Sequence, residues 1–156
     1  MDDREYFMNL ALSLARKAAA RGEVPVGAVI VRGGRVIAKG YNRREKKKNA
    51  LRHAEMEAIN KACRKLRGWR LCGCELYVTL EPCPMCAGAA INARIDRVII
   101  GAADPKNGAL CSVARLFEMP FTHRPELVTG VLEKECGAVL SDFFRALRAP
   151  GAPARK

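Results

Sequence analysis

The residues best suited to metal chemistry lie in two short motifs, His53-Ala54-Glu55 and, 30 residues after His53, Cys83-Pro84-Met85-Cys86. A catalytic zinc ion takes three protein ligands and leaves a fourth position for water. His53, Cys83 and Cys86 provide such a ligand set, because two cysteines at this spacing at the start of a helix reach one metal ion. Glu55 is close enough in sequence to exchange protons with that water without being a ligand. We therefore predict zinc-bound hydroxide as the attacking group and Glu55 as its proton shuttle.

The cysteine motif has two other interpretations, a redox pair and part of a structural zinc site. A lone C-x-x-C is also a redox motif, but Pro82 and Pro84 do not resemble a thioredoxin turn. A structural four-cysteine zinc site would combine this motif with Cys72 and Cys74, and that alternative stays open from the sequence.

The remaining cysteines and the second histidine have no metal-ligand spacing. Cys72 and Cys74 enter a strand-like run, where we expect them to pack as small apolar groups. We expect the same of the cysteines without a spacing partner, Cys63, Cys111 and Cys136. His123 is predicted to be a loop or surface histidine rather than a ligand.

Elements with two different hydrophobic periods must position the two motifs. Helical spacing predicts helices over residues 3–21, 52–66, 85–93 and 134–147, and a short helix over 112–117. Apolar runs bounded by turn residues predict strands over 24–31, 35–40, 74–80, 97–102 and 127–132. The first two strands form a hairpin at Gly33-Gly34, and residues 42–51 and 103–111 are predicted as loops. An α/β fold follows, a three-layer α/β/α domain around a mixed five-stranded sheet.

The length of 156 residues suits one domain, predicted to cover residues 1–148, with a breaker-rich and flexible tail at 149–156. No apolar run reaches 18 residues, so no membrane span is predicted. The acidic start, with Asp2 and Asp3, is unlike a signal peptide. We therefore expect a cytoplasmic protein with reduced cysteines.

The charge is strongly basic and unevenly spread. The chain has 28 Lys and Arg against 16 Asp and Glu, a net charge of +12, and residues 42–70 alone hold eleven Lys and Arg against three Glu. Such a patch predicts a polyanionic partner, and nucleic acid is the best candidate. A merely solvated loop and helix face is the alternative, whereas membrane binding would need a bulky apolar face that this segment lacks.

The order H-x-E followed by P-C-x-x-C is the signature of zinc nucleobase deaminases. Beyond this signature, the chain resembles the bacterial tRNA-specific adenosine deaminase family over residues 5–148. The matching segments are Glu23-Val24-Pro25-Val26-Gly27-Ala28-Val29, Gly40-Tyr41-Asn42, Leu76–Cys83, Met85–Ala89, Gly101-Ala102, Gly108-Ala109, Gly130-Val131-Leu132 and Leu140-Ser141-Asp142-Phe143-Phe144. The carboxy-terminal matches separate the tRNA enzymes from cytidine, cytosine and guanine deaminases.

The resemblance implies a cytidine-deaminase-like fold and a homodimer with one zinc ion per chain. It implies hydrolytic conversion of adenosine to inosine at the wobble position of an arginine tRNA, bound through its anticodon stem-loop. Asn42 matches a residue that holds the flipped nucleoside, and the backbone at Ala54 lies against the base. Asp104, Lys106 and Phe144 match positions near the anticodon loop.

Two departures from the family pattern concern docking rather than zinc chemistry. Residues 49–52 are Asn-Ala-Leu-Arg where the family usually has Asp-Pro and a small residue, and Cys111 stands where a glycine is usual. The sequence also allows two functions other than tRNA deamination. One is a deaminase of a free base or nucleoside of the guanine or cytosine type. The other is a zinc-stabilised RNA-binding module without catalysis, which Glu55 argues against.

Overall fold

Five strands form one mixed sheet in the order β2-β1-β3-β4-β5 in the computed structural model, which describes residues 2–152. β1 pairs antiparallel with both β2 and β3, whereas β3, β4 and β5 run parallel. The strands are β1 (Gly27–Arg32), β2 (Arg35–Tyr41), β3 (Cys74–Leu80), β4 (Arg97–Ala102) and β5 (Glu126–Val128). The predicted hairpin and mixed five-stranded sheet are confirmed.

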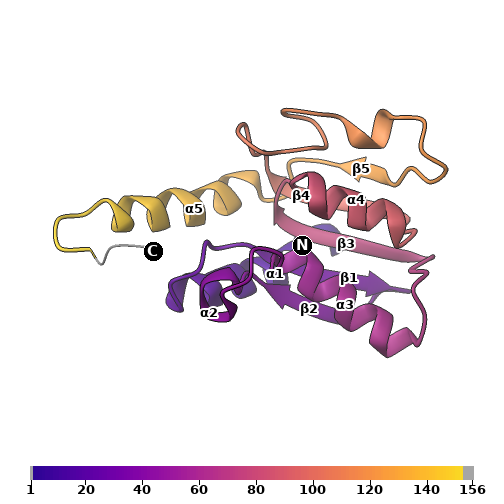
Figure 1. The fold of residues 1–156 in the computed structure, drawn as a ribbon, viewed down its shortest axis with the longest axis horizontal. Coiled ribbons are helices and arrows are strands. Elements are labelled where there is room, and N and C mark those ends of the chain that lie inside the picture. The colour runs from indigo at the N-terminus through magenta and orange to yellow at the C-terminus, as the bar shows by residue number, and fades with distance from the viewer. Residues whose placement is uncertain (1, 153–156) are drawn as a thin grey trace.

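Helices cover both faces of the sheet and complete the predicted three-layer α/β/α architecture (Figure 1). Alternation along β1 divides the core: Ala28 and Ile30 pack with α3 and α4, and Val29 and Val31 pack with α1. The helices are α1 (Asp3–Ala20), α2 (Arg44–Lys47), α3 (Ala54–Leu66), α4 (Pro84–Asn92), the 3-10 helix η1 (Leu116–Glu118) and α5 (Glu133–Leu147). In Figure 1, α5 extends beyond the edge of the sheet.

A glycine brings the first turn of α3 directly onto β2. A Cβ atom at Gly40 would overlap the Ala54 carbonyl oxygen and the Glu57 side chain. The close approach that this glycine permits places the start of α3 beside the end of β2. His53 and Asn42, which flank these two elements, are therefore neighbours in space.

Two predicted strands are too long. The run at 24–31 forms a strand only from Gly27, because the Val26 N–H donates to the Val24 carbonyl at 2.9 Å in a tight turn. The run at 127–132 forms β5 only as far as Val128, since Gly130 adopts a φ of 79° and turns the chain toward α5.

Two predicted loop and helix assignments are wrong. The basic loop at 42–51 contains the short helix α2, and the predicted helix at 112–117 is replaced by η1. The Leu116 N–H donates to the Ala109 carbonyl at 2.9 Å, whereas a helix that begins at 112 would direct it to the Ser112 carbonyl. In the predicted tail, residues 153–156 lie outside the described part of the chain. Among the helices of residues 2–152, none is long and apolar enough to span a membrane.

Candidate metal centre and active site

His53, Cys83 and Cys86 converge at the carboxyl end of β3. The His53 Nδ1 atom lies 3.7 Å from Cys83 Sγ and 3.5 Å from Cys86 Sγ. A tetrahedral site with a metal–nitrogen distance of about 2.05 Å and a metal–sulfur distance of about 2.3 Å separates nitrogen from sulfur by about 3.6 Å. The spacing of these three donor atoms therefore fits a metal ion with bond lengths like those of zinc. Among residues 2–152, they form the one group of His, Cys, Asp or Glu side chains placed to hold a metal ion.

We call His53, Cys83 and Cys86 the metal triangle, because their donor atoms could hold one metal ion. Two helix N-termini face each other across it. His53 is the N-cap of α3 and Cys83 is the N-cap of α4, and neither side chain caps its own helix. Both side chains are thus free to turn toward Cys86, while the helix dipoles favour negative charge between them. A hydrogen bond from Cys86, together with one from His53, lowers the pKa of Cys83 to about 4, and the shared proton raises the pKa of Cys86. At neutral pH, Cys83 of this cysteine pair is therefore a thiolate that is able to bind a metal ion.

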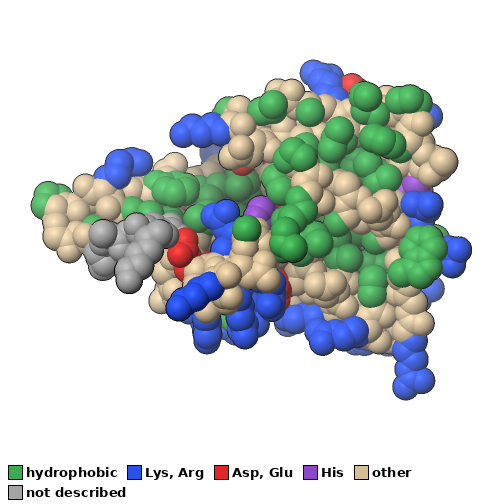
Figure 2. Space-filling model, viewed as in Figure 1, with side chains coloured by type: hydrophobic (Ala, Val, Ile, Leu, Met, Phe, Trp, Pro, Cys, Tyr) green, Lys and Arg blue, Asp and Glu red, His purple; other side chains and the backbone are tan. Residues whose placement is uncertain are grey.

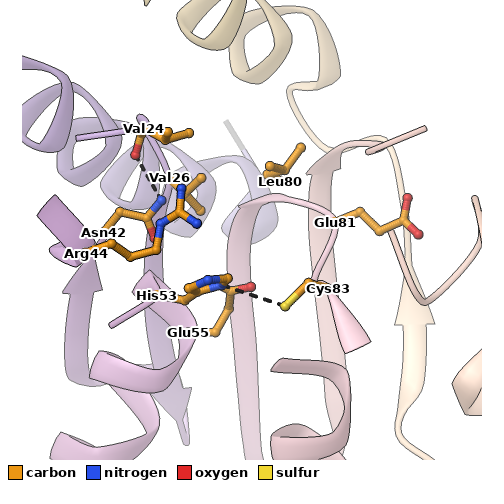
Figure 3. Close-up of a pocket in the computed structure, with 9 residues that line it drawn as sticks. All are labelled: Val24, Val26, Asn42, Arg44, His53, Glu55, Leu80, Glu81 and Cys83. Carbon is orange, nitrogen blue, oxygen red and sulfur yellow. Dashed lines mark hydrogen bonds between the residues drawn. The ribbon is translucent and has the colours of Figure 1, made fainter. Parts of the chain in front are cut away.

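Glu55 is the second residue of α3, in its first turn, and is 4% exposed. Burial raises the pKa of the Glu55 carboxyl, while its own backbone N–H and the neighbouring His53 oppose that shift. Figure 3 shows His53, Glu55 and Cys83 gathered on one side of the pocket. A buried carboxyl with a raised pKa beside a metal triangle is suited to accept and return a proton.

Asn42 connects the pocket to α3. Its Oδ1 atom accepts a hydrogen bond from the Ala54 N–H at 2.9 Å, and its Nδ2 atom donates to the Val24 carbonyl at 3.0 Å. Asn42 thereby supplies the helix cap that His53 does not. A cavity of about 90 Å³ opens here, lined by Val24, Val26, Asn42, Arg44, His53, Glu55, Leu80, Glu81 and Cys83. Asn42, His53, Glu55 and Cys83 thus line one pocket.

Glu81 has a structural role that the sequence analysis missed. Its carboxylate accepts hydrogen bonds from the backbone N–H groups of Asp104, Leu110, Cys111 and Ser112 at 2.9–3.0 Å, and from the Ser112 hydroxyl. Burial opposes ionisation, but these donors lower the pKa of Glu81 to about 2. In Figure 3 the Glu81 side chain points away from Glu55, toward this loop. The position of Glu81 directly after the apolar strand 74–80 is the sequence feature that could have indicated this role.

The loop that Glu81 holds leaves no room for a side chain at Gly108. A Cβ atom there would overlap the Glu81 carboxylate, so this glycine is required by a close approach. Cys111, by contrast, is not among the residues with positive φ, and its N–H donates to Glu81 at 2.9 Å. A cysteine therefore fits this loop although the family usually has glycine.

The three residues predicted near the anticodon loop lie outside the pocket of Glu55. The Asp104 carboxylate accepts hydrogen bonds from the backbone N–H groups of Lys106 and Asn107 at 3.1 and 3.2 Å, so it shapes its own turn. Lys106 and Phe144 instead line a separate hollow of about 510 Å³ between this loop and α5. The structure therefore brings Lys106 and Phe144 together, away from Asn42 and Ala54.

The residues before His53 are held by an ion pair. The Arg52 guanidinium contacts the Glu57 carboxylate, with an Nη2–Oε2 distance of 3.1 Å, and this hydrogen bond lowers the pKa of Glu57. The pair closes over the start of α3, where the family usually has a rigid proline. Arg52 is therefore tied to the protein and not simply an added charge at the pocket mouth.

The structure excludes the four-cysteine alternative. Cys72 and Cys74 lie at the start of β3, whereas Cys83 and Cys86 follow its end. Cys74 and Cys136 are buried and Cys63 and Cys111 half-buried, as packing residues should be, but Cys72 is exposed and its predicted packing is wrong. Cys72 lies in the turn before β3 rather than in the strand. His123 lies in a loop, with Nε2 2.6 Å from the Ile95 carbonyl oxygen.

Comparison with known proteins identifies the family. Residues 1–148 match the MafB19-like deaminase family. A tRNA-specific adenosine deaminase of Bacillus subtilis is 50% identical over 100% of this chain and 98% of its own length, and one of Agrobacterium fabrum is 48% identical over 95% and 98%. This chain belongs to the tRNA-specific adenosine deaminase family. The predicted family resemblance is confirmed.

Solved structures of deaminases share the fold. A structure from work on A-to-I editing by tRNA:A34 deaminases at the wobble position superposes with a TM-score of 0.84, at 48% identity over 86% of this chain and 99% of that one. A guanine deaminase from Nitrosomonas europaea superposes with a TM-score of 0.73, at 25% identity over 89% and 83%. The cytidine-deaminase-like fold is therefore confirmed. The fold is shared with free-base deaminases, so the substrate must be argued from the site and its surroundings.

Proposed function

We propose that this protein hydrolyses adenosine to inosine at the wobble position of a tRNA, with an arginine tRNA as the substrate. The observation that carries the proposal is the buried Glu55 carboxyl beside the His53, Cys83 and Cys86 triangle, in a chain 50% identical to a tRNA-specific adenosine deaminase. A purely structural metal site needs no buried carboxyl beside it. An RNA-binding module without catalysis is therefore disfavoured.

His53, Cys83 and Cys86 hold one zinc ion per chain in this proposal. Two thiolates and one imidazole suit zinc, and the nitrogen–sulfur distances near 3.6 Å support a tetrahedral arrangement. When bound, zinc activates water at neutral pH by lowering its pKa.

Glu55 moves the protons of the reaction. Its carboxylate takes one proton from the attacking water and delivers it to ring nitrogen 1 of adenine, so that carbon 6 becomes electrophilic enough for the oxygen to add. Glu55 then carries the second proton of the water to the amino group, which leaves as ammonia. The raised pKa of Glu55 supports this alternation, because a general acid–base group works best with a pKa near the operating pH.

The surroundings of the pocket support an RNA substrate. Asn42 and the Ala54 backbone are proposed to hold the flipped base, and Asp104, Lys106 and Phe144 to contact the anticodon loop. A loop base is already partly unpaired, so extruding it costs less than extraction from a duplex. Residues 42–70 add a charge of +8 beside the pocket, which suits a phosphate backbone. We further propose a cytoplasmic homodimer with residues 1–148 as its single domain.

A free-base or nucleoside deaminase is the second candidate, because a guanine deaminase shares the fold at 25% identity. The basic surface favours the tRNA substrate, since a free base has no phosphate to bind there.

A three-substrate assay separates these functions. The purified protein is given free guanine and cytosine, free nucleosides, and an arginine tRNA anticodon stem-loop with adenosine at the wobble position, and products are identified by mass spectrometry. We expect inosine at the wobble position of the stem-loop and little product from the small molecules. Turnover of guanine or cytosine without stem-loop turnover would support the second candidate.

A further inference from the structure

Three cationic side chains surround the ring of Tyr41, the last residue of β2. Lys17 Nζ lies 5.2 Å from the ring centroid, Arg21 Cζ lies 5.6 Å from it, and Arg43 Cζ lies 5.9 Å from it. Arg21 also donates a hydrogen bond to the Tyr41 hydroxyl at 3.4 Å. The attraction between the ring and each cation offsets part of their mutual repulsion. We call Lys17, Arg21 and Arg43 the Tyr41 cluster.

The Tyr41 cluster forms no close ion pair with another described residue, although the charge of Arg43 contributes, after the Arg52 hydrogen bond, to the lowered pKa of Glu57. Of the ion pairs formed within residues 2–152, none involves Lys17, Arg21 or Arg43. Glu23 follows Arg21 by two residues, but its carboxylate is buried and accepts hydrogen bonds from the Glu45 and Lys46 N–H groups at 3.0 and 2.9 Å. The cluster therefore keeps an outward positive potential that a bound anion would relieve.

The Tyr41 cluster continues the basic surface of α2. Glu23 ties the start of α2 to the end of α1, so cations from both elements lie side by side. Figure 2 shows Lys and Arg side chains gathered over α2 on the face that it displays. α2 and its flanks contribute Arg43, Arg44, Lys46, Lys47 and Lys48.

The cluster also adjoins the pocket of Glu55. Asn42, which lines the pocket, directly follows Tyr41 in sequence. Its Nδ2 atom donates to the carbonyl of Val24, and Val24 is only three residues after Arg21. Arg44 lines the pocket itself. Arg44 follows Arg43 in sequence and therefore connects the Tyr41 cluster to the pocket.

We propose that the Tyr41 cluster binds phosphates of the RNA strand that flanks the target adenosine. The inference rests on the proposed function, because it assumes that an RNA base enters the pocket. An RNA strand presents successive phosphates to cations from two elements, which a single small anion cannot do. The Tyr41 ring holds the cations in place before binding, so less side-chain entropy is lost when the phosphates arrive.

The test removes two charges and leaves the rest of the basic surface intact. In Lys17→Gln/Arg21→Gln both cations become neutral residues with good helix propensity, so α1 is retained. Arg43 is left unchanged, because its side chain is half-buried and its Nε atom lies inside the protein. The matched control, Arg32→Gln/Arg35→Gln, removes two exposed charges at the hairpin turn, at the other end of the same strands. Lys17→Arg/Arg21→Lys keeps both charges.

Binding is measured by fluorescence anisotropy of a labelled anticodon stem-loop between about 50 and 200 mM salt. We expect Lys17→Gln/Arg21→Gln to weaken the Kd about tenfold and to reduce the salt slope of log K by about 1.5–2, the loss of two phosphate contacts. The control and the charge-preserving variant should keep the wild-type slope.

A Kd and slope for Lys17→Gln/Arg21→Gln equal to those of the control would overturn the proposal. Anisotropy reports binding whether or not turnover occurs, so inosine formation in the same samples tests the proposed function separately. Wild-type protein that binds the stem-loop without forming inosine would remove the proposed function. The slopes would still decide the role of the cluster.

Discussion

Single side chains at the site each serve one positioning task that leaves the reacting groups free. Asn42 caps α3, so the His53 imidazole is available to the two sulfurs. Glu81 gathers the loop of residues 104–112 with a carboxylate that points away from Glu55, so Glu55 is the carboxyl beside His53 and Cys83. The cost of burying two carboxyls close together is met by different partners, backbone donors for Glu81 and the cations and dipoles of the site for Glu55.

Removal of single ligands tests the metal triangle. We expect Cys83→Ser and Cys86→Ser to lose bound zinc, because each removes one of three donors, whereas wild type holds about one zinc per chain. Cys72→Ser is the matched control, since Cys72 is exposed and lies at the other end of β3. Zinc content is measured by elemental analysis of purified protein. Full zinc in both ligand variants would refute the assignment.

Glu81→Gln tests the loop anchor. The amide keeps one oxygen, but its NH2 group faces backbone N–H donors that then lack an acceptor, so we expect a loss of about 2 kcal/mol in the free energy of unfolding. Zinc content should stay near one per chain, whereas the KM for the stem-loop should rise because the loop carrying Lys106 loosens. Urea unfolding and steady-state kinetics measure these effects. An unchanged unfolding midpoint and KM would show that the loop does not depend on Glu81.

At the scale of elements, the sequence predicts correctly those strands and helices whose formation depends on local residue patterns. The strands 74–80 and 97–102 have the predicted bounds, since unbroken apolar runs mark buried strands whatever lies around them. The short helix α2 was missed because its stability depends on Glu23, 22 residues away from Glu45. The helix predicted at 112–117 does not form because the Leu116 N–H bonds to the Ala109 carbonyl, in a loop that Glu81 gathers from a distance in sequence. Long-range side-chain caps are invisible to local periodicity.

The candidate site was predictable to a similar extent. The H-x-E and C-x-x-C spacings placed the metal triangle and Glu55, because a helix start fixes where the next residues point. The Arg52–Glu57 pair and the Glu81 network were not predicted, since they join residues whose contacts depend on the folded chain.

The lysines that follow Arg44 on the α2 segment test whether the predicted basic patch acts on RNA. If Lys46, Lys47 and Lys48 contact phosphates, changing all three to Ala should weaken stem-loop binding and reduce the salt slope of log K by about 2–3. The variant Lys61→Ala/Arg64→Ala/Lys65→Ala removes three charges from α3 as a comparison within residues 42–70. Anisotropy titrations at several salt concentrations provide the slopes. A wild-type slope in the triple lysine variant would mean that this segment is only a solvated surface.

At the scale of the whole molecule, the mixed sheet brings the reactive and the basic parts to one edge. The carboxyl ends of β2 and β3 lead directly to Asn42 and to Cys83, and two helices begin there with their positive ends toward the metal triangle. Of the net charge of +12, residues 42–70 carry +8, and this basic segment begins at the same edge, where it attracts anions.

Glu55→Ala is the most direct test of deamination by this site. The measurement is inosine formed at the wobble position of an arginine tRNA anticodon stem-loop, with zinc content determined in the same preparations. Wild type should convert the adenosine, and Glu55→Ala should keep about one zinc per chain but lose activity by at least about a hundredfold, since a general acid–base group contributes roughly 10²–10⁴ in rate. Full inosine formation by the zinc-loaded Glu55→Ala variant would contradict the assignment of Glu55 as the proton shuttle.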